Sequence, residues 1–186
     1  MGLDYSSPFF YADSEGCIAG MPHFYRKVEL ELAKQQRKLS RMRRGGSNYK
    51  KQMLTIAKIY TKIRNQRRDW QHKESRKIAD QWDIVCVEDI DMKKLAQELH
   101  LAKATGENSF GQFRSFLEYK MTQQGKRFIT IDKWYPSSKL CRHCGSINTE
   151  LTIAERTWIC PSCKEVIIRD YNAAINIREA GKAMIA

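Results

Sequence analysis

Four cysteines form two equally spaced pairs in the last third of the chain. Cys141-Arg-His-Cys144 and Cys160-Pro-Ser-Cys163 are separated by fifteen residues, the spacing of a four-thiolate metal site. Each Cys-x-x-Cys turn supplies two thiolates, and zinc binds four of them tetrahedrally. A redox dithiol role would explain one pair but not two with the same spacing. The spacing predicts one structural zinc ion, although iron accepts the same ligands.

The other cysteines, and the histidine inside the first pair, are not expected to bind this metal. Cys17 and Cys86 lie in strand-like runs, where a thiol packs as a small buried hydrophobic group. His143 stands between two cysteines, but four thiolates already complete a tetrahedral set, so we expect it at the surface.

Three acidic residues stand where predicted elements begin or end. Asp4 lies in the first short β-type run, Glu88 ends the apolar run of residues 84–87, and Asp170 opens the last predicted helix. If the two strands are neighbours, the three carboxylates converge, and they cannot all stay ionised together without cations. Two Mg²⁺ ions would satisfy them and form a phosphodiester-cleaving site. Singly, each acid could be a turn residue, a solvated strand end or a helix cap.

The chain is strongly basic, and the charge is concentrated. Its 33 Lys and Arg against 21 Asp and Glu give a net charge of +12. Between Arg26 and Lys77, 18 residues are basic and 4 are acidic, which favours a phosphate-binding face over a merely well-solvated surface. The candidate nucleic-acid contacts are Arg37, Lys38, Arg41, Arg43, Arg44, Lys50, Lys51, Lys139 and Arg142.

The pattern of apolar residues and turn residues predicts a mixed α/β chain. Short β-type runs near residues 3–5, 9–12 and 17–19 predict a meander, and residues 83–88 and 127–131 predict two further strands. Gly45-Gly46 separates a helix that opens at Pro22 from one capped by Ser47, which gives a basic helical hairpin. We expect its second helix to bury one stripe, formed by Met53, Ile56, Tyr60, Ile63, Trp70 and Ile78.

The rest of the chain is predicted to complete the core and a cleft. Residues 109–124 and 171–180 have helical periodicity. Residues 89–108 become polar and irregular, which is typical of a mobile loop. No internal repeat or low-complexity tract is present.

Bulk properties exclude some classes of protein. No run of 18 apolar residues exists, so no membrane span is expected. Asp4 interrupts any secretory signal, and a cytosolic location, where thiols stay reduced and bind metal, is therefore expected. The first strand has only three residues before Asp4, which suggests a piece of a longer protein.

Four runs of the sequence resemble the C-terminal, RuvC-like nuclease half of TnpB (OrfB) proteins, the RNA-guided nucleases of bacterial insertion sequences. The order of motifs matches over nearly the whole chain, and the zinc-ribbon segment with the run after it is the most specific part. The runs are Gly2–Ser6, Val85–Ile90, Tyr135–Gly145 and Arg169–Ile177.

The resemblance implies a fold, a set of domains and site residues. The fold would be RNase H-like, with residues 1–135 as the nuclease core and a helical hairpin inserted at about 22–82. A zinc ribbon would occupy 136–168, and 169–186 would hold the last nuclease motif. Residues 89–108 would be a lid. Asp4, Glu88 and Asp170 match the family's metal-binding catalytic acids, and Cys141, Cys144, Cys160 and Cys163 match its zinc ligands.

The chain departs from the family in two respects. Ile167-Ile168 stand where His-Asp usually precede Arg169-Asp170, but the three acids remain. The N-terminal half, which reads the target-adjacent motif and grips the guide RNA, is expected to lie outside this chain. DNA is thus the expected partner, with guide RNA in a full-length protein and no indication of oligomeric state.

The sequence leaves other functions open beside a two-metal DNA endonuclease. A non-catalytic nucleic-acid-binding module would be expected to lose the acids, and all three are present. An inert remnant of a mobile element would digest readily with protease. A strand transferase with a tyrosine nucleophile needs a His-apolar-His metal pair, which none of His23, His72, His100 and His143 forms.

Overall fold

The structure, a computed structural model, describes residues 1–6, 9–91 and 109–185. These residues divide into two compact units, one of Met1–Met21 with Ser75–Ala186 and one of Pro22–Glu74. No helix within them is long and apolar enough to cross a lipid bilayer. Most of the predicted lid, residues 92–108, lies outside the described residues.

The first unit contains a mixed five-stranded sheet in the order β3-β2-β1-β4-β5. β1 pairs antiparallel with β2, and β2 with β3, whereas β1 pairs parallel with β4, and β4 with β5. The predicted mixed sheet and N-terminal meander are confirmed. The strands are β1 Gly2–Tyr5, β2 Tyr11–Asp13, β3 Ile18–Ala19, β4 Ile84–Glu88 and β5 Arg127–Ile131.

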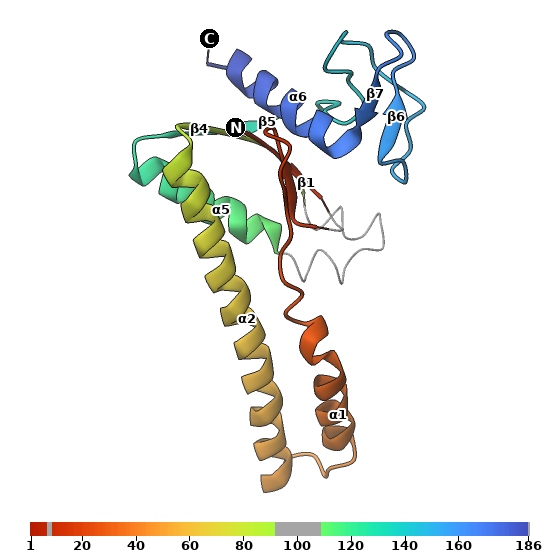
Figure 1. Cartoon of the computed structure of the whole chain (residues 1–186). Coiled ribbons are helices and arrows are strands. Elements are labelled where there is room, and N and C mark those ends of the chain that lie inside the picture. The colour runs from red at the N-terminus through yellow and green to blue at the C-terminus, as the bar shows by residue number, and fades with distance from the viewer. Residues whose placement is uncertain (7–8, 92–108, 186) are drawn as a thin grey trace. The chain divides into compact units, whose positions relative to one another are not determined.

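Two helices cover opposite faces of this sheet (Figure 1): α5 (Phe110–Gln123) and α6 (Arg169–Ala183). α5 packs through an aromatic cluster, in which Phe110 lies 4.9 Å from Tyr5 and 5.4 Å from Phe10 between ring centroids. α6 packs on β1 and β4 from the other side. Side chains alternate along a strand. In β1, the odd-numbered side chains therefore face α5 and the even-numbered residues face α6.

Two glycines bring α6 close to the strands. A Cβ added at Gly2 would lie 2.0 Å from the carbonyl oxygen of Ala174, and one added at Gly181 would lie 2.3 Å from Cys86 Sγ. Real Cβ atoms do not approach other atoms so closely, so any side chain there would push the helix away from the sheet. Glycine at these two positions therefore allows α6 to pack closely against the sheet.

Replacing Gly181 with Ala is expected to lower the free energy of unfolding by about 1–3 kcal/mol, because the added methyl overpacks the contact with Cys86. Urea denaturation of wild type and variant would measure the loss. The matched control is Gly111→Ala in α5, where the added Cβ meets nothing within 4 Å and alanine is the better helix former. Adding Cys86→Ala should recover part of the loss at Gly181, and equal stability of Gly181→Ala and wild type would contradict the contact.

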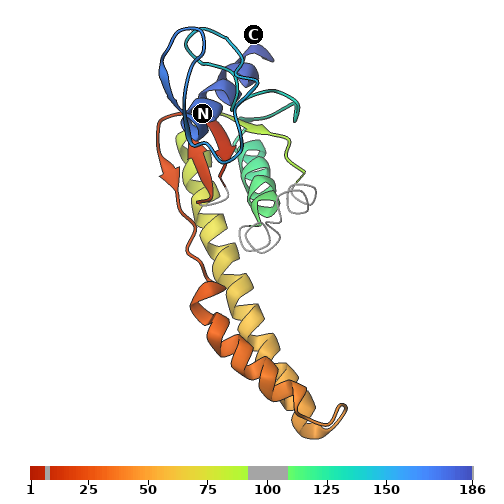
Figure 2. The ribbon, with the colours of Figure 1, turned by 90° about the vertical axis from the view of Figure 1, so that its right-hand side faces the viewer.

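The second unit is an antiparallel helical hairpin (Figure 2). The short η1 (Arg26–Val28) leads into α1 (Glu29–Ser40), and α2 (Ser47–Gln81) starts at the predicted serine and continues into the first unit. Gln52 is buried and donates to the backbone and side-chain oxygens of Gln35, at 3.2 and 2.7 Å. This polar pair joins the two helices.

The predicted core stripe of α2 is wrong in part. Ile56, Ile63 and Ile78 are buried, but Met53 and Tyr60 are 50% and 44% exposed. The buried series in the hairpin runs instead through Gln52, Ile56 and Ile63. A polar residue therefore takes the place expected of an apolar one, because it meets a hydrogen-bonding partner on α1.

The prediction that Cys17 is buried is also wrong, whereas Cys86 is buried as expected. Strand β3 begins only at Ile18. The Cys17 amide donates to Asp13 Oδ1 at 2.8 Å, so the residue belongs to the turn between two strands and its side chain lies in solvent.

Candidate functional site

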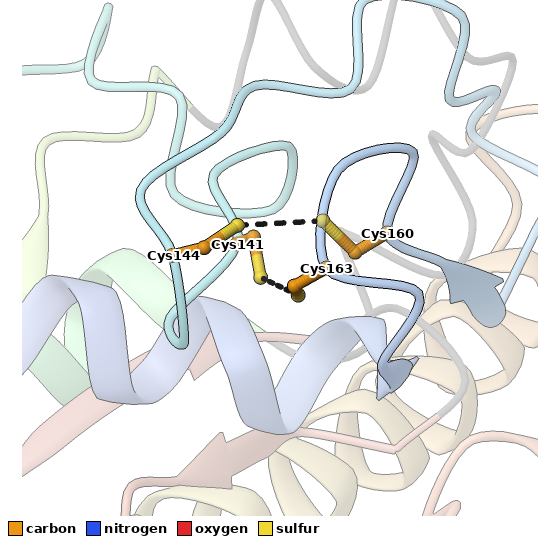
Figure 3. Close-up of side chains that lie close together, drawn as sticks. All are labelled: Cys141, Cys144, Cys160 and Cys163. Carbon is orange, nitrogen blue, oxygen red and sulfur yellow. Dashed lines mark hydrogen bonds between the residues drawn. The ribbon is translucent and has the colours of Figure 1, made fainter.

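The four cysteine sulfurs of the predicted metal site lie together in the first unit (Figure 3). Cys141 Sγ is 3.7 Å from Cys163 Sγ, Cys144 Sγ is 3.5 Å from Cys160 Sγ, and all four lie within 4.8 Å of one another. A tetrahedral zinc site with Zn–S bonds of about 2.3 Å has sulfurs about 3.8 Å apart. The described residues hold no other group of three or more metal-binding side chains arranged in this way, and the donor set fits zinc.

The two cysteine turns have the same backbone conformation. In the first, the Cys141 amide donates to Ser146 O and the Gly145 amide to Cys141 O. In the second, the Cys160 amide donates to Glu165 O and the Lys164 amide to Cys160 O. The residue after each second cysteine has a positive φ, 72° at Gly145 and 64° at Lys164. Two equivalent turns therefore present two pairs of sulfurs to one point.

Hydrogen bonds in the second turn favour a thiolate at Cys160. Burial opposes ionisation of Cys160, but hydrogen bonds from the amides of Cys163 and Ser162 lower its pKa to about 6. At Cys163, the backbone hydrogen bond with Glu165 lowers the pKa, but burial and hydrogen bonds with the other cysteine sulfurs raise it to about 12. A thiolate is the form that binds a metal ion. His143 is exposed, as expected for a residue that is not needed as a ligand.

The cysteine module is small and is attached to the last helix. It contains the hairpin of β6 (Thr157–Ile159) and β7 (Val166–Ile168), and its core consists of Cys141, Leu151, Trp158, Cys160 and Ile167. In α6, the buried side chains of Asn172 and Asn176 both donate to Leu140 O at 2.7 Å, and Asn176 also donates to Ser137 O at 2.8 Å. The segment that enters the first cysteine turn is thus held to the helix that carries Asp170.

The strand pairing brings two of the predicted acids side by side. Gly2 pairs with Cys86 and Leu3 with Val87 in parallel register, so the next residue on each strand is Asp4 or Glu88. By the alternation of side chains, Asp4 shares the face of Gly2, and Glu88 shares that of Cys86. These are the same side of the sheet, which α6 covers, since residues of α6 lie close to Gly2 and to Cys86.

Asp170, in the first turn of α6, completes an electrostatic cluster with them. Burial raises the pKa of Asp4 well above its usual value, and the charges of Asp170 and Glu88 raise it further. Burial also raises the pKa of Glu88 to about 7, against the opposing effect of the Arg114 guanidinium. Burial and neighbouring negative charges oppose the ionisation of these carboxylates. Divalent cations would stabilise the ionised form, and carboxylate oxygens are suitable ligands for them.

Sequence reasoning missed the side chains that hold Asp170. Arg156 Nη1 lies 3.0 Å from Asp170 Oδ2, Arg169 Nε lies 3.0 Å from Oδ1, and Ser6 Oγ donates to Oδ2 at 3.1 Å. Arg156 comes from the segment between the two cysteine pairs, so the cysteine module contributes a cation to the acidic cluster. Nothing in the spacing of Arg156 marked it, because the contact depends on how the module folds back on α6.

The predicted nucleic-acid contacts fall into two groups. Those on the helical hairpin are all exposed; they are Arg37, Lys38, Arg41, Arg43, Arg44, Lys50 and Lys51. Lys139 and Arg142, beside the first cysteine pair, are partly buried. Lys139 donates to Thr149 O, and the Arg142 guanidinium stacks 4.6 Å from the centroid of the Tyr171 ring. The second group has local roles in the structure that the sequence did not reveal.

Two family models match the chain, and together they cover most of it. The model described as "Probable transposase", of the OrfB type found in IS605, matches residues 1–99, and the model described as "Cas12f1-like, TNB domain" matches residues 110–177. The chain belongs to the OrfB/TnpB family. The resemblance seen in its motifs is confirmed.

Curated relatives of this chain are named as putative RNA-guided DNA endonucleases. A Streptomyces pristinaespiralis protein named "Putative RNA-guided DNA endonuclease" is 38% identical over all of this chain and 46% of its own length. InsQ of Escherichia coli K12, which bears the same name, is 24% identical over all of this chain and 50% of its own length. The chain thus spans about half the length of these relatives.

Solved structures show the same fold. The chain of a CRISPR–Cas12f ternary complex superposes with a TM-score of 0.67 at 19% identity, over 95% of this chain and 37% of its own. A Cas12f1–sgRNA–target DNA complex gives a TM-score of 0.64 at 17% identity, over 95% and 48%. The fold of this OrfB/TnpB chain is therefore that of a segment of Cas12f.

Proposed function

We propose that this chain is the nuclease half of a TnpB-type RNA-guided DNA endonuclease. The observation that carries the proposal is the parallel β1–β4 register on the face covered by α6, with Asp170 in the first turn of that helix. The parallel pairing of β1 with β4 makes Asp4 and Glu88 neighbours. Besides burial, the negative charge of Asp170 raises the pKa of Asp4. An RNase H-like, RuvC-type core of residues 1–135 with 169–186 accounts for this arrangement.

The three acids would hold two Mg²⁺ ions. The fit rests on the chemistry of the donors, which are all carboxylates, and on the raised pKa of Asp4 and Glu88, which indicates a site short of positive charge. Bound Mg²⁺ would lower the pKa of an attacking water and neutralise charge on the phosphate and the leaving 3′-oxygen. Asp4 and Glu88 lie on strands, so their backbone is held in place by the sheet.

Other parts of the chain would bind and orient the nucleic acid. Exposed cations of the hairpin, such as Arg41 and Lys50, would contact phosphates without reading sequence. The cysteine module, residues 136–168, would be a zinc ribbon that positions Arg156 beside Asp170. In this role Arg156, which forms an ion pair with Asp170, would contact a scissile phosphate.

Guide RNA and target choice belong to the proposal only through the relatives. Their names describe RNA-guided DNA endonucleases, and one matched structure contains sgRNA with target DNA. Since this chain spans about half of their length, we assign it the cleavage chemistry and DNA contact. Sequence selection would require pairing with a guide.

The proposal is tested by cleavage of a labelled single-stranded DNA by the zinc-loaded chain. We expect cleavage that requires Mg²⁺ and is lost in Asp170→Ala, while DNA affinity changes little. Binding with strong salt dependence but no cleavage would favour a non-catalytic binding module instead. Cleavage that persists in Asp170→Ala would refute the assignment of the acids.

A further inference from the structure

Trp134 is the most exposed aromatic side chain among the described residues, at 75%. It is also the one exposed tryptophan of the four in the chain, since Trp158 is buried and Trp70 and Trp82 are half-buried. Tryptophan usually hides most of its large ring. A ring left in solvent on an ordered turn is a candidate binding surface.

Two hydrogen bonds hold the turn that carries Trp134. Its amide donates to Asp132 Oδ1 at 2.7 Å, and the Tyr135 amide donates to Asp132 O at 3.1 Å. On the far side, Tyr135 packs against the core cluster that contains Ile131 and Ile177. The neighbouring residue is thus anchored inside while Trp134 projects outward, so the exposed ring does not come from a loose segment.

The turn lies at the edge of the sheet where Glu88 ends its strand. Glu88 pairs with Ile131, and Trp134 follows Ile131 by three residues. Strands lie about 4.8 Å apart and the chain spans at most about 3.5 Å per residue, so the Cα atoms of Glu88 and Trp134 are within about 15 Å of each other. A nucleic-acid strand held at the acidic cluster would therefore pass within reach of the ring.

Lysine accompanies the ring. Lys133 Nζ lies 5.3 Å from the centroid of Trp134, within the range of a cation–π contact. At 75% exposure, most of the Trp134 side chain remains accessible to solvent. An aromatic face beside a cation is the combination that holds a base by stacking and its phosphate by charge.

We propose that Trp134 is a stacking platform for one nucleobase of the single DNA strand entering the acidic site, with Lys133 contacting the adjacent phosphate. The inference rests on the proposed function, because DNA is its ligand. Stacking accepts any base, since every base has a π-face, so the platform positions the strand and does not read its sequence.

Binding of a fluorescein-labelled dT12 oligonucleotide, measured by anisotropy without Mg²⁺, tests the platform. We expect Trp134→Ala to weaken binding about tenfold, as for loss of one stacked base, and Trp134→Phe to keep most of the affinity. Plots of affinity against salt for wild type and Trp134→Ala should be parallel, because no charge is lost. Lys133→Ala should make the slope shallower.

The matched control is Tyr119→Ala. Tyr119 is also exposed, at 40%, and also has a lysine 5.8 Å from its ring centroid, but it lies on α5, which covers the face of the sheet opposite to α6 (Figure 1). This variant should bind dT12 like wild type. A loss equal to that of Trp134→Ala would overturn the proposal, because any exposed aromatic would then serve.

Tryptophan fluorescence gives a second readout that does not depend on cleavage. Unlabelled dT12 should quench the emission of wild type, and the quenching should disappear in Trp134→Phe. If Trp134→Ala binds as tightly as wild type and no quenching occurs, the ring serves another purpose and the platform is wrong. Quenching in a chain that does not cleave would support the platform and refute the nuclease. Absence of any dT12 binding would overturn both.

Discussion

Glu88→Gln is expected to reduce the rate of Mg²⁺-dependent DNA cleavage about 10³-fold or more, since a metal contact is worth several kcal/mol and each 1.36 kcal/mol is tenfold. The amide has the shape of the carboxylate but no charge, so it leaves one of the three proposed ligands neutral. Phosphate contacts elsewhere remain, and DNA affinity should change by less than about twofold. Single-turnover cleavage of an end-labelled oligonucleotide measures the rate.

The loss should not come from unfolding. Burial raises the pKa of Glu88 from 4.5 to about 7, so the free energy of unfolding falls as pH rises through this interval, and the ionised carboxylate disfavours the folded state at higher pH. A neutral glutamine avoids that cost, and thermal unfolding of the zinc-loaded protein at pH 8 without added Mg²⁺ should show Glu88→Gln at least as stable as wild type.

A matched control removes a carboxylate from the same unit without touching the cluster. Glu118 is exposed on α5, and Glu118→Gln should cleave at the wild-type rate. Normal cleavage by Glu88→Gln, or an equal loss in both variants, would refute the role assigned to Glu88.

Removal of the zinc is expected to unfold residues 141–168 and leave the mixed sheet folded. The buried core of this module consists of five residues, of which two are cysteines, so it is too small to fold without a metal. Structural zinc contributes about 10–16 kcal/mol in comparable small modules. Cys160→Ser removes one ligand, and the neutral serine hydroxyl is a poor substitute for a thiolate.

Metal content and limited proteolysis would measure this effect. Wild type should hold one zinc ion per chain, and trypsin should spare the module until a chelator is added. Cys160→Ser should lack zinc and be cut between residues 141 and 168, while the sheet strands resist. Cys17 is an exposed thiol outside the quartet, so Cys17→Ser should behave like wild type. A Cys160→Ser chain that keeps its zinc and its resistance would contradict a structural site.

Local patterns in the sequence were sufficient for the elements. Gly45-Gly46 followed by Ser47 predicted the start of α2, and the run 127–131 is a strand with those bounds. These features depend on turn chemistry and on the period of neighbouring residues, which act over a few positions. One error occurred where a partner distant in sequence mattered, since Gln52 is buried because Gln35 accepts its hydrogen bonds; the other, at Cys17, came from a local turn held by Asp13.

The candidate site needed more than local information. Asp4, Glu88 and Asp170 could be named from motifs, but their separation in the chain says nothing of distance, and only the β1–β4 register makes the first two adjacent. Arg156 could not be found at all, because its partner is determined by the fold of the cysteine module on α6.

By itself, the sequence determined the cysteine quartet, the family and the succession of helices and strands other than β6 and β7. Cysteine spacing is sufficient because a short turn brings two thiols together whatever the rest of the chain does. The tertiary structure alone decided which acids meet, how closely α6 approaches the sheet at Gly2 and Gly181, and which ring remains in solvent. Those features depend on strand register and on packing between residues far apart in the chain, for which no local pattern exists.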